Sequence, residues 1–220
     1  MADHQQATRL TIIKSFVGIA LLLYFAYSLF VQDSRELASQ IQSEINLSSS
    51  LMPSDKWKMV TDNTESHFSH VMNDLNLRSY LNTVLIPENH SESGINLVMN
   101  KFSSFNYTAS RNIPLIIFQT LYRWNLLFVW GILFIPFIAA FALDGMYQWK
   151  LKRFQFGKVT IQFYRIWLKA FTLITVLISA YLILPNIFIF NNVAQLFPPL
   201  ACMILGIAFN RLAANFQKLM

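Results

Sequence analysis

Three side chains in the first half of the chain are of types that bind metal ions. They are His67, His70 and Asp74, spaced three and four residues apart. On a helix this spacing places all three on one face, as the ligands of a zinc ion would need. Structural zinc sites use four ligands, and this segment has neither a nearby cysteine nor a His-Glu-x-x-His pattern. We therefore interpret the three residues as a polar helix face, and we predict no metal site and no cofactor.

The sequence also lacks the patterns that carry catalysis or coupled transport. Its six glycines are isolated, so there is no Gly-rich phosphate loop, and neither G-x-S-x-G nor S-x-x-K occurs. Asp144 is the only acidic residue after Glu92, which leaves proton-coupled transport almost no relay. Asp144 either anchors a helix end beside nearby cations or has a functional role. We predict that the protein is not an enzyme.

One stretch, residues 143–158, combines basic and aromatic residues between two long apolar runs. Such a set binds anionic lipid headgroups, at about 1 kcal/mol per basic residue near the surface. It also fits the docking of a partner protein, because aromatic and arginine residues dominate interface energetics. Both interpretations remain open, and they share the following residues. We call this set the contact stretch: Asp144, Gly145, Tyr147, Trp149, Lys150, Lys152, Arg153, Phe154, Phe156 and Lys158.

The composition indicates a membrane protein with several spans. Of the 220 residues, 55% are hydrophobic and only 13% are charged, against roughly 25% charged in ordinary soluble domains. Four apolar runs are long enough to cross a bilayer of about 30 Å. They are residues 15–31, 125–143, 170–190 and 193–209. The first run lacks a signal-peptide cleavage site, so we expect it to remain as the first transmembrane helix.

Charge sets the predicted orientation of these spans. Residues 32–112 carry six basic and nine acidic residues, whereas the rest of the chain carries eleven basic and two acidic residues. Basic segments stay on the cytoplasmic side, and these are the N-terminus, the loop 144–169 and the C-terminus. We therefore predict a multi-pass protein of the bacterial inner membrane with both termini cytoplasmic and residues 32–112 extracytoplasmic.

The extracytoplasmic region is predicted to be mostly helical. Leu37, Ile41 and Ile45 recur every four residues, which predicts that the first helix continues beyond the membrane as a stalk. Ser48 to Pro53 ends it, and a second helix is predicted to start at a capping residue, Ser54 or Asp55. Its apolar stripe comprises Trp57, Val60, Thr64, Phe68, Val71, Met72 and Leu75. Helix or turn then continues up to Pro87, and the pattern defines no fold for residues 88–112.

Residues 113–220 form the third predicted unit: an interfacial helix over 113–124, followed by three spans. Tyr122 and Trp124 are expected at headgroup level, and Arg123 is expected to extend to the membrane surface. The fold class is therefore all-α, with four transmembrane helices and a small helical extracytoplasmic domain between the first and second spans.

Several short motifs resemble a family of membrane proteins from integrating conjugative elements and conjugative plasmids. These are Leu121-Tyr122-Arg123, Ala139-Ala140, Leu143-Asp144-Gly145, the 150–157 cluster and Tyr164. The resemblance rests on residues 121–165, about a fifth of the chain. It implies a four-span inner-membrane protein whose gene accompanies a coupling ATPase and other type IV secretion components. It brings no activity that can be assigned to a residue.

Together these features predict a non-enzymatic accessory or assembly component of a conjugative DNA-transfer (type IV secretion) system. The expected partners are membrane lipid and other membrane proteins, including a coupling ATPase, with no direct binding of nucleic acid. The alternative is a small membrane transporter or channel component, which would require polar residues that converge at mid-bilayer. A membrane enzyme is a third class, and it would require a cleft with paired ionisable residues.

Overall fold

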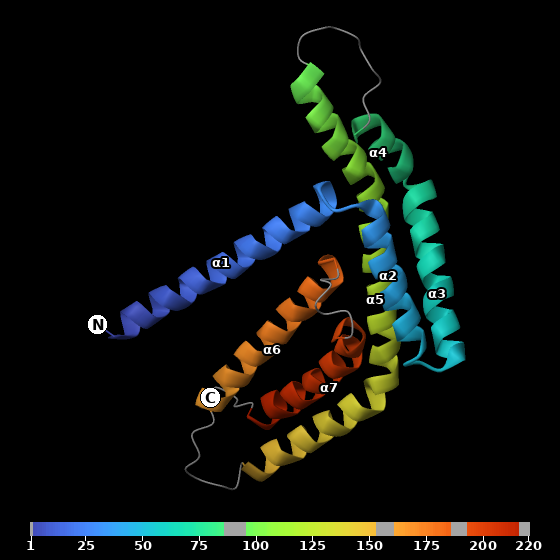
Figure 1. Ribbon diagram of the computed structural model, residues 1–220. Helices are drawn as coiled ribbons and strands as arrows, with labels where there is room; N and C mark the ends of the chain where they lie inside the picture. The colour runs from blue at the N-terminus through green and yellow to red at the C-terminus, as the bar shows by residue number, and fades with distance from the viewer. Residues whose placement is uncertain (1, 86–95, 153–160, 186–192, 216–220) are drawn as a thin grey trace.

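The computed structural model describes residues 2–85, 96–152, 161–185 and 193–215, and these are helical apart from short connections (Figure 1). No strand occurs among them, so the predicted all-α class is confirmed for the described part of the chain. The helices are α1 (Ala2–Phe30), α2 (Ser34–Ser49), α3 (Ser54–Ser69), the π-helical turn η1 (His70–Asp74), α4 (Leu77–Leu85), α5 (Asn96–Lys152), α6 (Ile161–Ile183) and α7 (Val193–Ala214).

The helices form two groups that cross each other in Figure 1. We call the first the transverse layer: α2, α3, α4 and the part of α5 that precedes Pro136. The second, the apolar bundle, contains α6, α7 and the part of α5 that follows Pro136, and α1 runs in a similar direction but apart from them in Figure 1. The helix α5 thus belongs to both groups and is the element against which most others pack.

The first helix does not continue as a stalk. It ends at Phe30, and α2 leaves it at an angle of 111°. The carboxylate of Asp33 accepts a hydrogen bond from the Arg35 backbone N–H and so caps α2 as a new helix. Leu37 and Ile41 then bury against Ile116 of α5. The stalk prediction was wrong because the apolar stripe of α2 is covered by α5.

The apolar stripe of α3 covers the next part of α5. Val60 lies in a buried cluster with Met52 of the preceding turn and with three α5 residues: Tyr122, Leu126 and Val129. The Trp57 ring packs edge-on against the Tyr122 ring, with centroids 6.1 Å apart. Tyr122 is thus buried in the transverse layer, and its predicted place among lipid headgroups was wrong.

The ends of this region also differ from the predictions in detail. The predicted cap of α3, Ser54 or Asp55, was wrong: Pro53 occupies the cap position, Ser54 is the first helical residue, and no side chain caps the helix. Leu75, predicted on the buried stripe, is 65% exposed because the π-helical turn breaks the helical period before it. Residues 96–112, for which the sequence pattern defined no fold, form the start of α5.

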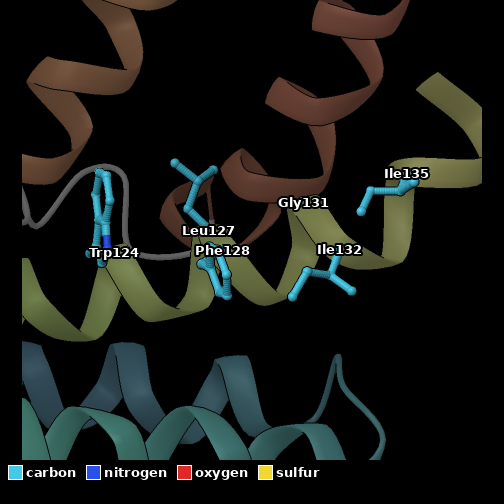
Figure 2. Close-up of a pocket in the computed structure, with 6 residues that line it drawn as sticks. All are labelled: Trp124, Leu127, Phe128, Gly131, Ile132 and Ile135. Carbon is cyan, nitrogen blue, oxygen red and sulfur yellow. The ribbon is translucent and has the colours of Figure 1, made fainter. Parts of the chain in front are cut away.

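Helix α5 is a single helix of 57 residues. At about 1.5 Å per residue it is roughly 85 Å long, far more than a bilayer core of about 30 Å. It passes residues 112 and 113 without a break and contains Pro114 and Pro136. It changes direction part-way along its length (Figure 1), and Figure 2 shows Ile135 at this turn, next to Pro136, where proline removes one helical hydrogen bond.

The basic connection is shorter than the predicted loop over residues 144–169. Helix α5 continues to Lys152 and α6 begins at Ile161, so most of the predicted loop is helical. Both α5 and α6 therefore extend beyond the apolar runs that were predicted as the second and third spans.

Within the described residues, three helices are long and apolar enough to cross a membrane, over Phe105–Leu151, Phe163–Ile183 and Leu196–Ala214. A fourth candidate is the bent pair of α1 and α2, over Ser15–Phe30 and Ser34–Ser49. These helices expose many large apolar side chains, as expected where lipid is the solvent.

Candidate functional site

The most buried charged groups of the described chain meet where the transverse layer touches the apolar bundle. Arg123 of α5 and Glu44 of α2 form an ion pair, with side chains 2% and 1% exposed. The guanidinium binds the carboxylate in a bidentate way, with Nε 2.7 Å from Oε1 and Nη2 2.8 Å from Oε2. Gln119, one turn before Arg123, donates a further hydrogen bond of 2.9 Å to Glu44 Oε2. Both carboxylate oxygens therefore have donors from α5.

The third guanidinium nitrogen of Arg123 turns towards α6. Its Nη1 lies 2.5 Å from the carbonyl oxygen of Tyr181 and 2.6 Å from that of Leu184. The last carbonyls of a helix lack partners within the helix, and a cation there also complements the helix dipole. Arg123 thus caps the C-terminal end of α6.

Aromatic contacts connect Arg123 to α7 through Tyr181. The guanidinium carbon of Arg123 lies 4.7 Å from the centre of the Tyr181 ring. That ring stacks on Phe197 of α7, with centroids 4.5 Å apart. We call Glu44, Gln119, Arg123, Tyr181, Leu184 and Phe197 the polar junction. It joins α2, α5, α6 and α7 through consecutive contacts.

Two further α5 side chains bind neighbouring helices through polar contacts. Asn112, fully buried, donates to the carbonyl oxygens of Ser28 and Gln32, each at 2.9 Å, and so caps the end of α1. Asn125 donates to the Thr64 hydroxyl of α3 at 3.2 Å. One face of α5 therefore holds the ends of α1 and α6, while another holds α3.

One sequence feature indicates this junction, although no motif does: the position of Glu44 on α2. Glu44 lies on the same face of α2 as Leu37, Ile41 and Ser48, all of which are buried. A carboxylate on an apolar helix face requires a buried partner. Arg123 was expected to extend to the membrane surface; this was wrong, because Glu44 and the α6 carbonyls satisfy its charge within the protein.

The contacts of the polar junction hold helices in position. The Arg123 guanidinium donates four hydrogen bonds to protein acceptors. The Glu44 carboxylate receives three hydrogen bonds. Removal of one partner from a buried ion pair typically costs about 3–5 kcal/mol, because the other charge is left uncompensated. The junction is therefore a structural determinant of how the two groups of helices sit together.

The predicted contact stretch divides between two surfaces of α5 where the structure describes it. Asp144 accepts hydrogen bonds from Asn210 and Gln148, and Gly145 is buried against Asn210. Tyr147 is 63% exposed, and the ammonium of Lys150 lies 5.9 Å from the centre of its ring.

The rest of the contact stretch is less fully described. Trp149 is half-buried, and Lys152 is the last residue of α5. The remaining members lie outside the described residues, and they are Arg153, Phe154, Phe156 and Lys158.

The three candidate metal ligands do not gather into one site. His70 Nδ1 lies 2.5 Å from Asp74 Oδ2, whereas His67 Nδ1 lies 3.4 Å from the Asn125 amide nitrogen. Among the described residues, no group of three or more His, Cys, Asp or Glu side chains is placed to hold a metal ion.

A shallow hollow of about 350 Å³ lies along α5 just before its bend (Figure 2). Its lining follows one face of the helix: Trp124, Leu127, Phe128, Gly131, Ile132 and Ile135. In Figure 2, Trp124 marks one end of this row and Ile135 the other, with α2 and α3 beyond the opposite side of α5. The lining is almost wholly apolar, and the indole N–H of Trp124 is the one polar side-chain group among these six residues.

Taken together, the fold and the junction define an all-helical protein with several helices of membrane-spanning length, braced by a transverse layer. A family model matches residues 32–217, and the chain belongs to that family, DtrJ-like, described as "IncC plasmid conjugative DNA transfer protein DtrJ-like". The predicted membership in a conjugative transfer family is therefore confirmed. No curated protein and no solved structure matches the chain.

The match extends well beyond the motifs that first indicated it. Those motifs cover residues 121–165, whereas the family match includes the transverse layer, α6 and α7. Both members of the Glu44–Arg123 pair lie within it. The family description points to a role in conjugation.

Proposed function

We propose that this protein is a non-enzymatic, integral inner-membrane accessory or assembly component of a conjugative DNA-transfer apparatus of the type IV secretion class. The observation that carries the proposal is the family match over residues 32–217, in a chain whose described part has three to four helices of membrane-spanning character. A protein of this kind acts by holding other components in place, which agrees with a buried centre composed of helix-binding contacts.

In the proposed arrangement the chain crosses the membrane four times. Figure 1 places the start of α1, the end of α5, the start of α6 and the end of α7 towards one side, and the transverse layer at the other. Four basic residues at the end of α5 and in the first half of α6 belong to the first of these sides: Lys150, Lys152, Arg165 and Lys169. The positive-inside rule makes it the cytoplasm and puts the transverse layer outside.

The proposed partners are membrane lipid and other membrane proteins of the apparatus, including a coupling ATPase, without direct contact to nucleic acid. The contact stretch supplies the cytoplasmic binding surface in this proposal. Tyr147 and Lys150 support it, because both are exposed on the last turns of α5.

The position of the buried polar groups disfavours a transporter. A transport path needs polar side chains gathered near mid-bilayer. Here three of the described buried polar side chains bind the end of a neighbouring helix or a single carboxylate: Asn112 at the end of α1, Arg123 at the end of α6 and Asn210 at Asp144. The accessory role is therefore the better supported of the two.

A complementation experiment tests the proposal. An in-frame deletion of the gene in its conjugative element should reduce transfer to a recipient by at least about 100-fold, and a copy supplied in trans should restore it. The tagged protein should sediment with inner membranes and resist alkaline carbonate extraction. A frame-shifted copy serves as the control. Undiminished transfer from the deletion strain would exclude a role in conjugation, and release by carbonate would exclude integral insertion.

A further inference from the structure

One side chain of the polar junction, Arg123, binds two different helices at once, α2 and α6. Two nitrogens of Arg123, Nε and Nη2, are taken by Glu44 of α2. The remaining one, Nη1, is taken by two carbonyl oxygens at the end of α6. A guanidinium is planar and rigid, so fixing one edge against a carboxylate fixes the direction in which the other edge points.

This geometry makes the hold on α6 depend on α2. Within the described residues, Glu44 is the one acidic group paired with Arg123, and the guanidinium lies almost wholly out of solvent. If α2 moved away, the buried cation would lose its counter-charge. Its long side chain would then gain by turning towards water, because an unpaired buried charge is strongly disfavoured. That movement would withdraw Nη1 from the α6 carbonyls.

We propose that the Glu44–Arg123 pair couples the transverse layer to the α6–α7 hairpin, so that displacement of α2 releases the end of α6. Tyr181 extends the coupling to α7, because its ring contacts both the guanidinium and Phe197. A component that binds the transverse layer could thereby alter the packing of the last two helices. The proposal does not rest on the role in DNA transfer, since it concerns contacts within the chain.

Accessibility of the end of α6 provides the measurement. The native cysteine is first removed as Cys202→Ala, and Leu184→Cys then places a single thiol at the junction. Leu184 contributes its backbone carbonyl to Arg123, so this substitution leaves that acceptor in place. Labelling by a water-soluble maleimide is followed in membranes from donor cells that were grown without recipient cells. A failure of the coupling is thus read independently of any failure in conjugation.

Glu44→Gln in this background should raise the labelling rate by about tenfold, as expected for the loss of hydrogen bonds to a charged group. Glu36→Gln is the matched control, because Glu36 lies on the same helix and is exposed. It should label like the parent. Equal labelling of the Glu44→Gln and Glu36→Gln variants, whether raised or unchanged, would overturn the proposal.

Two further variants keep the test decisive if Glu44→Gln accumulates poorly. Arg123→Lys retains the charge but loses the fork, so it should also raise labelling. The exchange Glu44→Arg with Arg123→Glu restores an ion pair between α2 and α5. It should not restore protection, because a carboxylate at position 123 cannot donate to the α6 carbonyls. Parent-like labelling of either variant would contradict the proposed coupling.

Discussion

Asn210 of α7 binds Asp144 of α5 at the end of the apolar bundle opposite the polar junction, with the amide nitrogen 2.8 Å from carboxylate Oδ2. The same amide donates to the carbonyl oxygen of Phe141 at 2.8 Å. Here α5 and α7 approach so closely that a Cβ built on Gly145 would lie 2.6 Å from the Asn210 carbonyl oxygen. The printed contacts of Asp144 are with the amide groups of Asn210 and Gln148, whereas the predicted anchoring role named nearby cations.

This close approach predicts that Gly145→Leu destabilises the packing of α5 on α7. The new side chain would have to displace backbone, and overpacking of this kind typically costs about 1–3 kcal/mol. We expect a lower thermal-unfolding midpoint of the purified protein in detergent. Gly18→Leu is the control, since a Cβ at Gly18 meets nothing within 4 Å. An unchanged midpoint for Gly145→Leu would mean that α5 and α7 are not packed this closely.

Asn112 gives a second prediction, on the end of α1. Asn112→Leu removes the donor that binds the Ser28 and Gln32 carbonyls, and it leaves these buried groups without that partner. An unsatisfied buried polar group costs about 1–3 kcal/mol, so the protein should unfold at lower temperature or denaturant. Asn46→Leu, at an exposed position of α2, should change stability far less. Similar stability of the two variants would show that Asn112 does not secure α1.

The sequence predicted most helices because their apolar periods are local. Val60 and Thr64 follow such a period and are buried as expected. The sequence did not predict the turn after Phe30. Leu37 and Ile41 show the same helical spacing of apolar residues whether α2 continues α1 or folds onto α5. That choice depends on Ile116, about 75 residues further along the chain.

The polar junction was missed for a related reason. Glu44 and Arg123 are far apart in sequence: the apolar face of α2 indicates that Glu44 needs a buried partner, but no local pattern identifies Arg123 as that partner. Only the packing of α2 on α5 brings them together. The contact stretch shows the opposite case: its residue types were evident, but Asp144 and Gly145 face α7 whereas Tyr147 is exposed. Local sequence identified the stretch and could not divide it between packing and binding.

The proposed topology predicts the location of fused reporters. Alkaline phosphatase fused after residue 70 should be active, because residue 70 begins η1, between α3 and α4 of the transverse layer, which is proposed to be outside. Fusions after residue 155 and at the C-terminus should be inactive as phosphatase and fluorescent as green fluorescent protein. Phosphatase activity at residue 155 would reverse the orientation of α5 and α6 and contradict the four-span arrangement.

The last prediction separates lipid binding from partner docking at the contact stretch. Replacement of Tyr147, Trp149, Phe154 and Phe156 by leucine keeps an apolar surface for lipid but removes the aromatic groups that dominate protein interfaces. We expect conjugative transfer to fall by at least about tenfold, while the protein level and the reporter topology stay normal. Tyr147 supports this expectation, since it is exposed beside Lys150 and not committed to packing against α7.

A matched set of charge-preserving changes completes this test. Lys150, Lys152 and Lys158 changed together to arginine keep the positive charge that sets orientation and attracts anionic lipid. Transfer should therefore remain close to that of the unmodified protein. If the four-leucine variant also transfers DNA normally, the stretch binds lipid and not a protein partner. If the arginine variant alone loses transfer, then the shape of the lysine side chains, and not their charge, is what the partner recognises.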